Sequence, residues 1–305
     1  LEDFKKEFMN KSKEAIVKFA TLINSPNCTG DDLFNCKNVK ESFDASNAED
    51  SKWLFDVLDA KECYDLNFSL YKPSFDVELI STLNLGNSGY CNASHYCNDI
   101  WYSDKCNNSS DLFGCIAINK KKYCIFNKQY SKEEFIMLKE KIIEHMKETG
   151  EWCQFFPIGT SNFGYNETVA QEYFPLTEAE CKSKNLPWWD KLVGTYGKET
   201  LKSLEIPDSI DDIKDEIVNE VLVCSCGRNY KIVPYELNLY RKLNLPIPKE
   251  CPNCRHEKRN KIAGTRKLWQ RKCMNKGCEN QFETSYAPEQ PEIVYCEKCY
   301  QQAVY

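Results

Sequence analysis

Four closely spaced pairs of cysteines in the last third of the chain constrain its folding more than any other feature of the sequence. They are Cys224 and Cys226, Cys251 and Cys254, Cys273 and Cys278, and Cys296 and Cys299. A short turn lets the two thiolates of a pair converge on an ion, and the chain that follows brings a second pair across to complete a tetrahedron. The pairs therefore predict two zinc sites with four thiolates each. Because such sites leave no coordination position for water, both Zn²⁺ ions are predicted to be structural.

The residues around the pairs indicate the type of zinc module. Each second pair runs into a predicted helix, at 255–258 and at 300–302. A pair on a turn, a hairpin-sized stretch and a pair at a helix start are typical of treble-clef and zinc-ribbon domains. The first pair is separated by a single residue, so His256 is an alternative ligand at that site. We predict the two modules at residues 220–262 and 263–305.

The cysteine content also indicates the cellular compartment. Thiolates that hold zinc need a reducing environment, and no apolar run reaches the roughly 18 residues of a membrane helix. We therefore predict a soluble cytoplasmic protein without membrane contact. Its length of 305 residues predicts about two domains. The other ten of the 18 cysteines are predicted to be reduced and to act as small hydrophobic residues. Since the chain begins with Leu1, it remains open whether it is a fragment of a longer protein.

An aromatic residue recurs through the region 26–130, among short runs rich in Asn, Asp, Ser and Cys. The recurring residues are Phe43, Phe55, Tyr64, Phe75, Tyr90, Trp101, Phe113 and Tyr123. A mean spacing of about eleven residues is the mark of a stacked repeat. With two strands per coil, it predicts a parallel β-solenoid whose coils have about 22 residues. An antiparallel sheet with coincidental spacing is the alternative. Residues 1–25 have the apolar period of an amphipathic helix, which is predicted to cap the solenoid.

Residues 131–219 are predicted to form a helical, aromatic-rich linker region. Ser131 with Glu134, and Thr177 with Glu180, have the spacing of capping boxes and each pair is expected to start a helix. Residues 205–219 are acidic and polar and are predicted to be a hinge into the first zinc module. The predicted architecture is an α+β multidomain chain with an N-terminal capping helix, a β-solenoid, this linker region and tandem zinc modules.

Charge is distributed unevenly along the chain. The net formal charge is −6, yet residues 221–305 contain 15 Lys and Arg against 8 Asp and Glu. A basic tail on an acidic body indicates contact with a polyanion, although attraction between the two parts of the chain explains it as well.

The densest basic stretch, 255–272, supplies candidates for nucleic-acid binding. They are Arg255, Lys258, Arg259, Lys261, Arg266, Lys267, Trp269, Arg271 and Lys272. Cations neutralise phosphates and an aromatic ring stacks on an unpaired base, so RNA is the favoured partner. The alternative is a solvated helix face that carries charge for solubility.

Indications of catalysis are weaker. A group that could hold a third metal consists of Cys91, His95, Cys97 and Cys106, although core residues are the commoner explanation in a cysteine-rich repeat. Another candidate group, Asn166, Glu167, Gln171 and Glu172, has no partner nucleophile or phosphate-binding loop. Some treble-clef domains are nucleases that need a catalytic histidine and a metal site with an open position, and His256 alone does not meet that requirement. We therefore expect a non-catalytic nucleic-acid-binding protein, with a protein-interaction scaffold as the alternative and an enzyme of unknown class as the third.

Two segments resemble known bacterial zinc modules. Residues 220–259, which include Cys226-Gly227-Arg228 and Cys251-Pro252-Asn253-Cys254-Arg255, resemble a small treble-clef zinc-binding domain. Residues 268–301, which end in Tyr295-Cys296-Glu297-Lys298-Cys299-Tyr300, resemble the related ribbon. With 122–130 and 165–175, the chain is similar to uncharacterised zinc-ribbon proteins of candidate-phylum bacteria and their phages. The resemblance implies tandem zinc modules, and that family carries no established activity.

Overall fold

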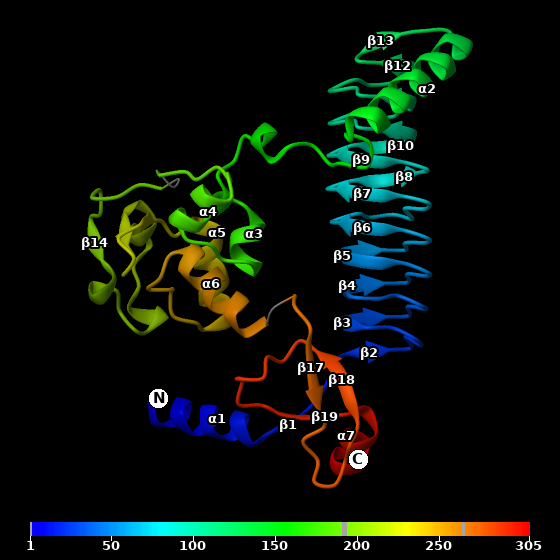
Figure 1. Ribbon diagram of the computed structural model, residues 1–305. Helices are drawn as coiled ribbons and strands as arrows, with labels where there is room; N and C mark the ends of the chain where they lie inside the picture. The colour runs from blue at the N-terminus through cyan, green and yellow to red at the C-terminus, as the bar shows by residue number, and fades with distance from the viewer. Residues whose placement is uncertain (1, 191–193, 264–265) are drawn as a thin grey trace. The chain divides into compact units, whose positions relative to one another are not determined.

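A computed structural model of the chain describes residues 2–190, 194–263 and 266–305 (Figure 1). The chain forms two compact units, one made of residues 1–157 with 266–305 and the other of residues 158–265. The second of the two predicted modules therefore lies mainly in the same unit as the N-terminal half of the chain. The first predicted module shares its unit with the preceding residues 158–219.

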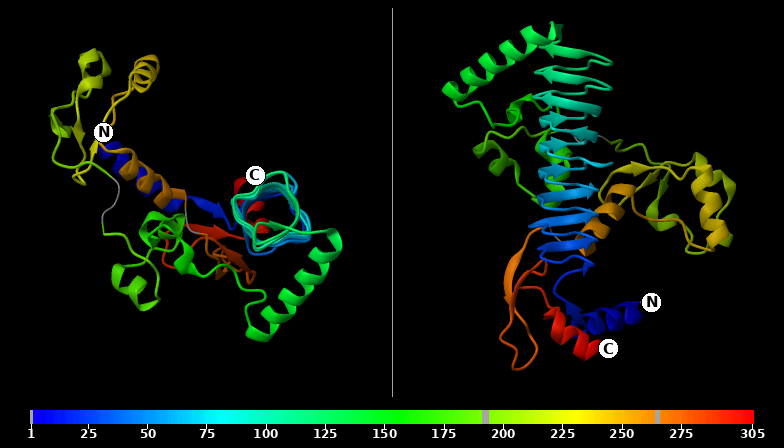
Figure 2. Two further views of the ribbon diagram at one scale, coloured as in Figure 1. Left: turned by 90° about the horizontal axis from the view of Figure 1, so that it is seen from above. Right: turned by 90° about the vertical axis from the view of Figure 1, so that its right-hand side faces the viewer.

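The first unit is built around a parallel β-solenoid, which confirms the predicted fold class (Figure 1). Its 12-stranded sheet contains β2 (Leu22–Ile23), β3 (Gly30–Phe34), β4 (Ser42–Ser46), β5 (Lys52–Leu58), β6 (Tyr64–Asn67), β7 (Val77–Ile80), β8 (Leu83–Gly86), β9 (Gly89–Asn92), β10 (His95–Trp101), β11 (Ser110–Phe113), β12 (Lys122–Ile125) and β13 (Lys128–Gln129). Paired strands are parallel except β12 and β13 at the C-terminal end. Viewed along the axis, the coils superimpose as a closed ring (Figure 2, left).

The length of a coil differs from the predicted one. Gly30 pairs with Ser42 and Phe43 pairs with Phe55, so that stacked residues are 12 apart in sequence. The prediction of a coil nearly twice as long is therefore wrong. The recurring aromatic residues lie on different faces of the coil, which explains their irregular spacing. Phe43 and Phe55 do stack, with ring centroids 5.8 Å apart.

A period of three residues explains the shape of the coil. From Leu54 to Leu66 every third side chain is buried, and the residue before each buried one has a positive φ. Trp53, Asp56 and Asp59, for example, have φ values of 57°, 55° and 59°. Each such residue turns the chain, so a coil consists of very short sides. Asn and Asp adopt the left-handed conformation more readily than other residues with a side chain, which accounts for their abundance here.

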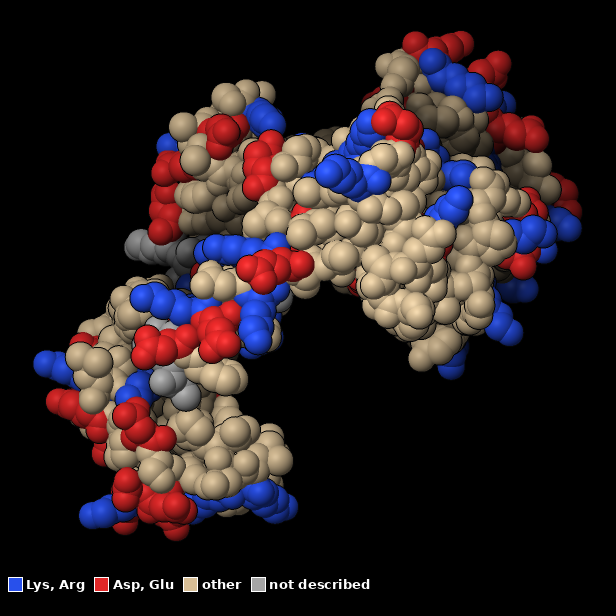
Figure 3. Space-filling view, turned by 90° about the horizontal axis from the view of Figure 1, so that it is seen from below, with Lys and Arg blue, Asp and Glu red and all other residues tan. Residues whose placement is uncertain are grey.

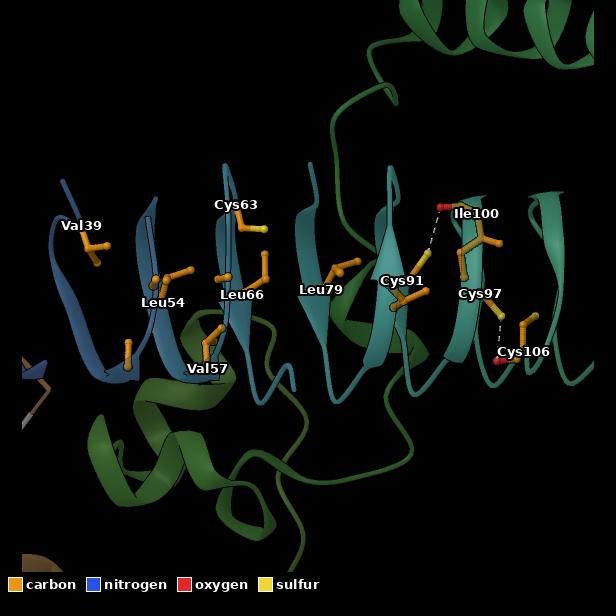
Figure 4. Close-up of a cluster of buried hydrophobic side chains, with 14 of the residues drawn as sticks. Val39, Leu54, Val57, Cys63, Leu66, Leu79, Cys91, Cys97, Ile100 and Cys106 are labelled. Carbon is orange, nitrogen blue, oxygen red and sulfur yellow. Dashed lines mark hydrogen bonds between the residues drawn. The ribbon is translucent and has the colours of Figure 1, made fainter. Parts of the chain in front are cut away.

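The interior of the solenoid is filled with aliphatic and Cys side chains (Figure 4). Buried Ser side chains also lie there. Several buried serines hold successive coils in register, because each of them accepts the backbone N–H of the residue stacked on it. Ser88 Oγ accepts from Ile100 N at 3.2 Å, and Ser94 Oγ accepts from Cys106 N at 3.1 Å. The polar backbone inside the solenoid is satisfied in this way without water.

Replacement of Ser94 by alanine is expected to lower the free energy of unfolding by about 1–3 kcal/mol, because the buried N–H of Cys106 loses its acceptor. Ser46→Ala, in β4, is the matched control, since the Ser46 side chain is only half-buried and makes no hydrogen bond within the described residues. Urea denaturation of both variants makes the comparison. Equal stabilities would contradict the role given to the interior serines.

Segments from both ends of the chain complete the first unit. At the N-terminal end of the solenoid lie β1 (Ile16–Lys18), β17 (Trp269–Lys272), β18 (Gln281–Thr284), β19 (Ile293–Tyr295) and α7 (Glu297–Val304), with β1 pairing in parallel with β19 (Figure 1). At the other end, α2 (Lys132–Thr149) begins with the predicted capping box of Ser131 and Glu134 and packs its buried Phe135 against the last coils. The solenoid is thus followed by a helix at one end and joined by the second zinc module at the other.

The N-terminal helix is shorter than the apolar period indicated. It ends at Glu14 as α1 (Glu2–Glu14), because Ile16–Lys18 forms a strand with β19. Phe4 and Phe8 on this helix are 76% and 65% exposed. Of the apolar residues that continued the period beyond Glu14, Ile16 and Ile23 belong to strands.

The second unit consists of short elements around the first group of four cysteines, Cys224, Cys226, Cys251 and Cys254. They are η1 (Ile158–Thr160), η2 (Tyr165–Glu167), α3 (Val169–Tyr173), α4 (Glu178–Ser183), β14 (Leu201–Lys202), η3 (Ser203–Glu205), η4 (Ile210–Asp212), η5 (Asp215–Asn219), β15 (Leu222–Val223), β16 (Asn229–Tyr230), α5 (Pro234–Leu243) and α6 (Pro252–Ala263). The capping box predicted for Thr177 and Glu180 starts α4.

The prediction of a hinge at 205–219 is wrong. Ile206, Ile210, Ile213 and Ile217 are buried and pack with the core of the first zinc module. Their acidic neighbours face solvent, so the polar composition concealed an apolar row with spacings of four, three and four residues. This segment is therefore a packed part of the module and not a hinge that leads into it.

Candidate metal centres

The first centre joins two short loops of the second unit. Cys224 and Cys226 lie between β15 and β16, on a turn that Gly227 closes with a φ of 84°. Cys251 immediately precedes α6, and Cys254 lies in its first turn. The four Sγ atoms lie within 4.8 Å of one another. The tight first pair is therefore compatible with a four-cysteine site.

The second centre has the same plan in the first unit. Cys273 and Cys278 flank the turn between β17 and β18, and Cys296 and Cys299 lie at the start of α7. The four Sγ atoms again lie within 4.8 Å of one another. Cys296 N donates to Cys273 Sγ at 3.3 Å, a backbone contact that orients the sulfur. Both groups of four match the sets predicted from the spacing of the cysteines.

The sulfur positions fit one tetrahedral ion in each centre. Cys226 Sγ lies 3.8 Å from Cys251 Sγ, and Cys278 Sγ lies 3.9 Å from Cys296 Sγ. A metal–sulfur distance near 2.3 Å gives a tetrahedron with edges of about 3.8 Å. The same separations are too long for disulfides, whose sulfur atoms are about 2.05 Å apart. Each centre is therefore arranged to hold a metal ion, and four thiolates leave no position open for a substrate.

Backbone N–H groups favour the thiolate form at one cysteine of each centre. Burial raises the pKa of Cys224, but hydrogen bonds from the backbone N–H groups of Cys226 and Cys251 outweigh it and lower the pKa to about 6. Burial also raises the pKa of Cys296, and the N–H of Cys299 contributes to an overall lowering to about 7. The thiolate is the form that binds a metal, so these hydrogen bonds favour it at one cysteine of each centre. Contacts with neighbouring thiols contribute to a raised pKa at Cys254 and Cys299.

His256 is not a ligand of the first centre. Its Nε2 atom lies 3.0 Å from Glu172 Oε1, and Asn260 Nδ2 donates to Glu172 Oε2 at 2.8 Å. This cluster joins α6 to α3 within the second unit. The alternative in which His256 replaces a cysteine of the first pair is therefore wrong.

The other residues considered for a pocket serve the local fold. Asn166 Nδ2 donates to the Trp189 carbonyl at 2.9 Å, and Glu167 Oε2 accepts from Gly164 N at 3.0 Å. Gln171 forms two hydrogen bonds with the backbone of Leu176. These contacts hold the turns around α3 and involve no nucleophile.

The suggested third metal group is part of the solenoid interior. Within the described residues, metal-ligand atoms converge in the two four-cysteine groups and not at Cys91, His95, Cys97 and Cys106. Instead the thiols donate to backbone carbonyls, from Cys91 to Ile100 at 3.4 Å and from Cys97 to Cys106 at 3.6 Å (Figure 4). Burial raises the pKa of Cys106 to about 11. These cysteines act as small core residues, which was the other explanation offered by the sequence.

The basic stretch 255–272 is divided between the two units. Arg255, Lys258, Arg259 and Lys261 lie on α6 in the second unit, whereas Arg266, Lys267, Trp269, Arg271 and Lys272 lie in the first. Figure 3 shows blue and red side chains interspersed over the face that it presents. The stretch is therefore not a single element of the fold.

Several cations of this stretch contact acceptors in their own unit. Arg255 lies near Glu236, Lys258 pairs with Glu250, and Lys272 pairs with Glu279. Arg271 donates to the Ala287 carbonyl at 3.1 Å. Arg259, Lys261 and Lys267 are exposed and make no ion pair within the described residues.

Arg266 has the most contacts of the predicted cations. It pairs with Asp44 and Asp56 on adjacent coils, with a side chain that is only 12% exposed. Its guanidinium also lies 5.8 Å from the ring centroid of Phe55. Two stacked Phe-Asp dipeptides thus bind one arginine from far along the chain, and Arg266 is an anchor to the solenoid.

The fold and the two centres define a metal-binding β-solenoid protein. No protein-family model matches the sequence, and no curated protein matches it. Within the described residues, no helix is both long enough and apolar enough to cross a membrane.

Proposed function

We propose that this protein binds RNA, and that its two metal ions are structural Zn²⁺. The observation that carries the proposal is the position of α6, which begins at the ligand pair of the first centre and presents Arg259 and Lys261 to solvent. The zinc ion would fix the start of this helix and so position its cations.

Zinc is proposed because of the donor set. Four thiolates in a tetrahedron suit Zn²⁺ or an iron centre, and zinc is the usual ion where a ligand pair begins a helix after a short turn. Elemental analysis of natively purified protein tests the assignment. Two zinc atoms per chain are expected, and iron or a metal content well below two would contradict it.

RNA is proposed as the partner because exposed cations beside an aromatic ring suit phosphates and unpaired bases. Lys267 lies 5.3 Å from the ring centroid of Trp269 in the first unit, and Arg259 with Lys261 offers a second group of cations in the other. Single-stranded or structured RNA fits better than a specific duplex, since the described residues offer no helix with a row of base-reading side chains.

Substitution of both exposed cations on α6, Arg259→Gln with Lys261→Gln, is expected to weaken RNA binding and its dependence on salt. For a single strand, each lost phosphate contact reduces the slope of log affinity against log salt by about 0.7. Fluorescence anisotropy with a labelled RNA at several salt concentrations measures both quantities. The matched control is Lys132→Gln with Lys147→Gln, two exposed cations on α2. Equal affinity for the two double variants would contradict a role for α6.

A protein scaffold is the second candidate, and exposed aromatic rings on the solenoid favour it. Phe68, Tyr71 and Phe75 are 41%, 61% and 60% exposed around a single coil. Such rings bind protein partners through apolar contacts, which salt weakens little. Binding of a partner protein that persists at high salt, with no binding of RNA, would favour this candidate.

A further inference from the structure

A groove with a volume of about 860 Å³ follows one corner of the solenoid. One row of its lining residues is Asn84, Tyr96, Asn108 and Lys120, spaced by 12 residues, and a second row is Gly86, Asn98, Ser110 and Lys122. Gly86, Asn98, Ser110 and Lys122 are directly paired in the strand register. Since stacked positions lie along the axis, the groove is straight and crosses successive coils. Neighbouring coils are about 4.8 Å apart, so it extends about 19 Å from Lys72 to Lys120.

The groove is positively charged although the chain as a whole is negative. Four exposed lysines line it, at Lys72 on one end and at Lys120, Lys121 and Lys122 on the other. None of the four makes an ion pair within the described residues, and no carboxylate lines the groove. In a protein of net charge −6, four unneutralised lysines in one depression indicate an anionic ligand.

Two aspartates next to the lining residues already have partners. Asp99 accepts from Asn87 and Asn98, and Asp111 accepts from Ser110 at 2.9 Å. These hydrogen bonds hold the two carboxylates beside the groove. Neither carboxylate lines the groove, so the charged side chains that line it are the lysines at its ends.

The floor and the centre of the groove suit an extended ligand that carries flat rings. Small residues keep the floor low: a side chain at Gly86 would place its Cβ 2.9 Å from Asn98 Oδ1. Tyr96 stands midway between the lysine ends and is 56% exposed. The amides of Asn84 and Asn108 flank it along the same row and offer both donors and acceptors.

We propose that this groove binds a short single strand of nucleic acid, with a base stacked on Tyr96 and phosphates at the lysine ends. The ligand class rests on the RNA binding proposed above, whereas the site is a separate one in the first unit. A cationic groove with an exposed aromatic ring is the general arrangement for binding single strands without sequence preference. At the 3.4 Å rise of a stacked strand, about 19 Å accommodates up to about six nucleotides. An acidic polysaccharide is the competing ligand, and the aromatic ring between amides favours bases over it.

Anisotropy titration of the full chain with a labelled ten-nucleotide RNA tests the site. Lys120→Gln with Lys122→Gln is expected to weaken binding roughly tenfold at low salt and to reduce its salt dependence. Tyr96→Ala is expected to weaken binding by a similar factor without changing the salt slope, and Tyr96→Phe should retain affinity because it keeps the ring. Lys37→Gln with Lys61→Gln, exposed lysines on other coils, is the matched control and should bind as the unsubstituted protein does. Unchanged thermal unfolding of each variant shows that the solenoid is intact.

The outcomes separate this site from the one on α6. If Arg259→Gln with Lys261→Gln weakens RNA binding and the groove variants do not, the groove proposal is overturned and the function proposed above stands. If only the groove variants weaken binding, the groove is supported and α6 is not the site. If the groove variants lose affinity for polygalacturonate and keep their affinity for RNA, the groove is assigned to an acidic polysaccharide and the proposal is overturned.

Discussion

Replacement of Cys296 by serine is expected to release the metal of the second centre and to destabilise the N-terminal end of the solenoid. The module around this centre is part of the same packing unit: β19 pairs with β1, and Thr284 Oγ1 donates to the Phe19 carbonyl at 2.5 Å. Phe19 also packs on Phe282, with ring centroids 5.0 Å apart. A structural zinc ion contributes about 10–16 kcal/mol to small modules, which equals or exceeds the stability of a typical domain.

Cys251→Ser is the matched variant, because the first centre belongs to the other unit. It should lose one metal ion per chain while the first coils of the solenoid keep their protection. Hydrogen exchange of residues 16–34, measured together with the metal content of both variants, makes the comparison. Equal protection of these residues in the two variants would contradict the dependence of the solenoid end on the second centre.

The metal centres could be predicted from the sequence because their geometry is local. Cys296 and Cys299, like Cys251 and Cys254, lie within four residues of each other at a helix start, and their spacing alone restricts how the thiols point. The solenoid was also predictable, since stacked coils leave a repeat in the sequence. The length of a coil could not be predicted in the same way. The interior positions recur every three residues, and they are occupied by residues of many types. Leu54, Val57, Ala60 and Cys63 share only their burial.

Contacts between distant parts of the chain could not be inferred from composition. Arg266 belonged to a basic stretch that predicted phosphate binding, and its partners Asp44 and Asp56 are 222 and 210 residues away. The groove was missed for a related reason. Its lysines are Lys72 and Lys120–Lys122, and only stacking of the coils brings them to one depression. The 12-residue spacing of Asn84, Tyr96 and Asn108 is the feature of the sequence that could have revealed it.

Replacement of Asp76 by serine is expected to stabilise the solenoid at neutral and alkaline pH. Asp76 occupies an interior position of the single 13-residue coil, where neighbouring coils have Cys63 and Ser88. Burial raises its pKa from 3.8 to about 7, against the opposing effect of hydrogen bonds from the N–H groups of Ser88 and Ser74. Between pH 3.8 and about 7, the folded state therefore keeps a proton on Asp76 that the unfolded state has largely released.

The consequence is a loss of stability as pH rises. The contribution of the protonated carboxyl is fully present below pH 3.8 and is lost as the pH rises through about 7. A shift of about three pH units corresponds to roughly 4 kcal/mol at most. Serine at this position would accept the Ser88 N–H as Ser51 Oγ accepts the Cys63 N–H, without carrying a charge.

Urea denaturation from pH 5 to pH 8 tests this expectation. The unsubstituted protein should lose stability over this range, whereas Asp76→Ser should lose much less and should be the more stable protein at pH 8. Asp50→Asn, which removes an exposed carboxylate from the outside of the solenoid, is the control for a general effect of charge. If Asp76→Ser and Asp50→Asn show the same pH profile, the buried carboxyl does not control the stability of the coil.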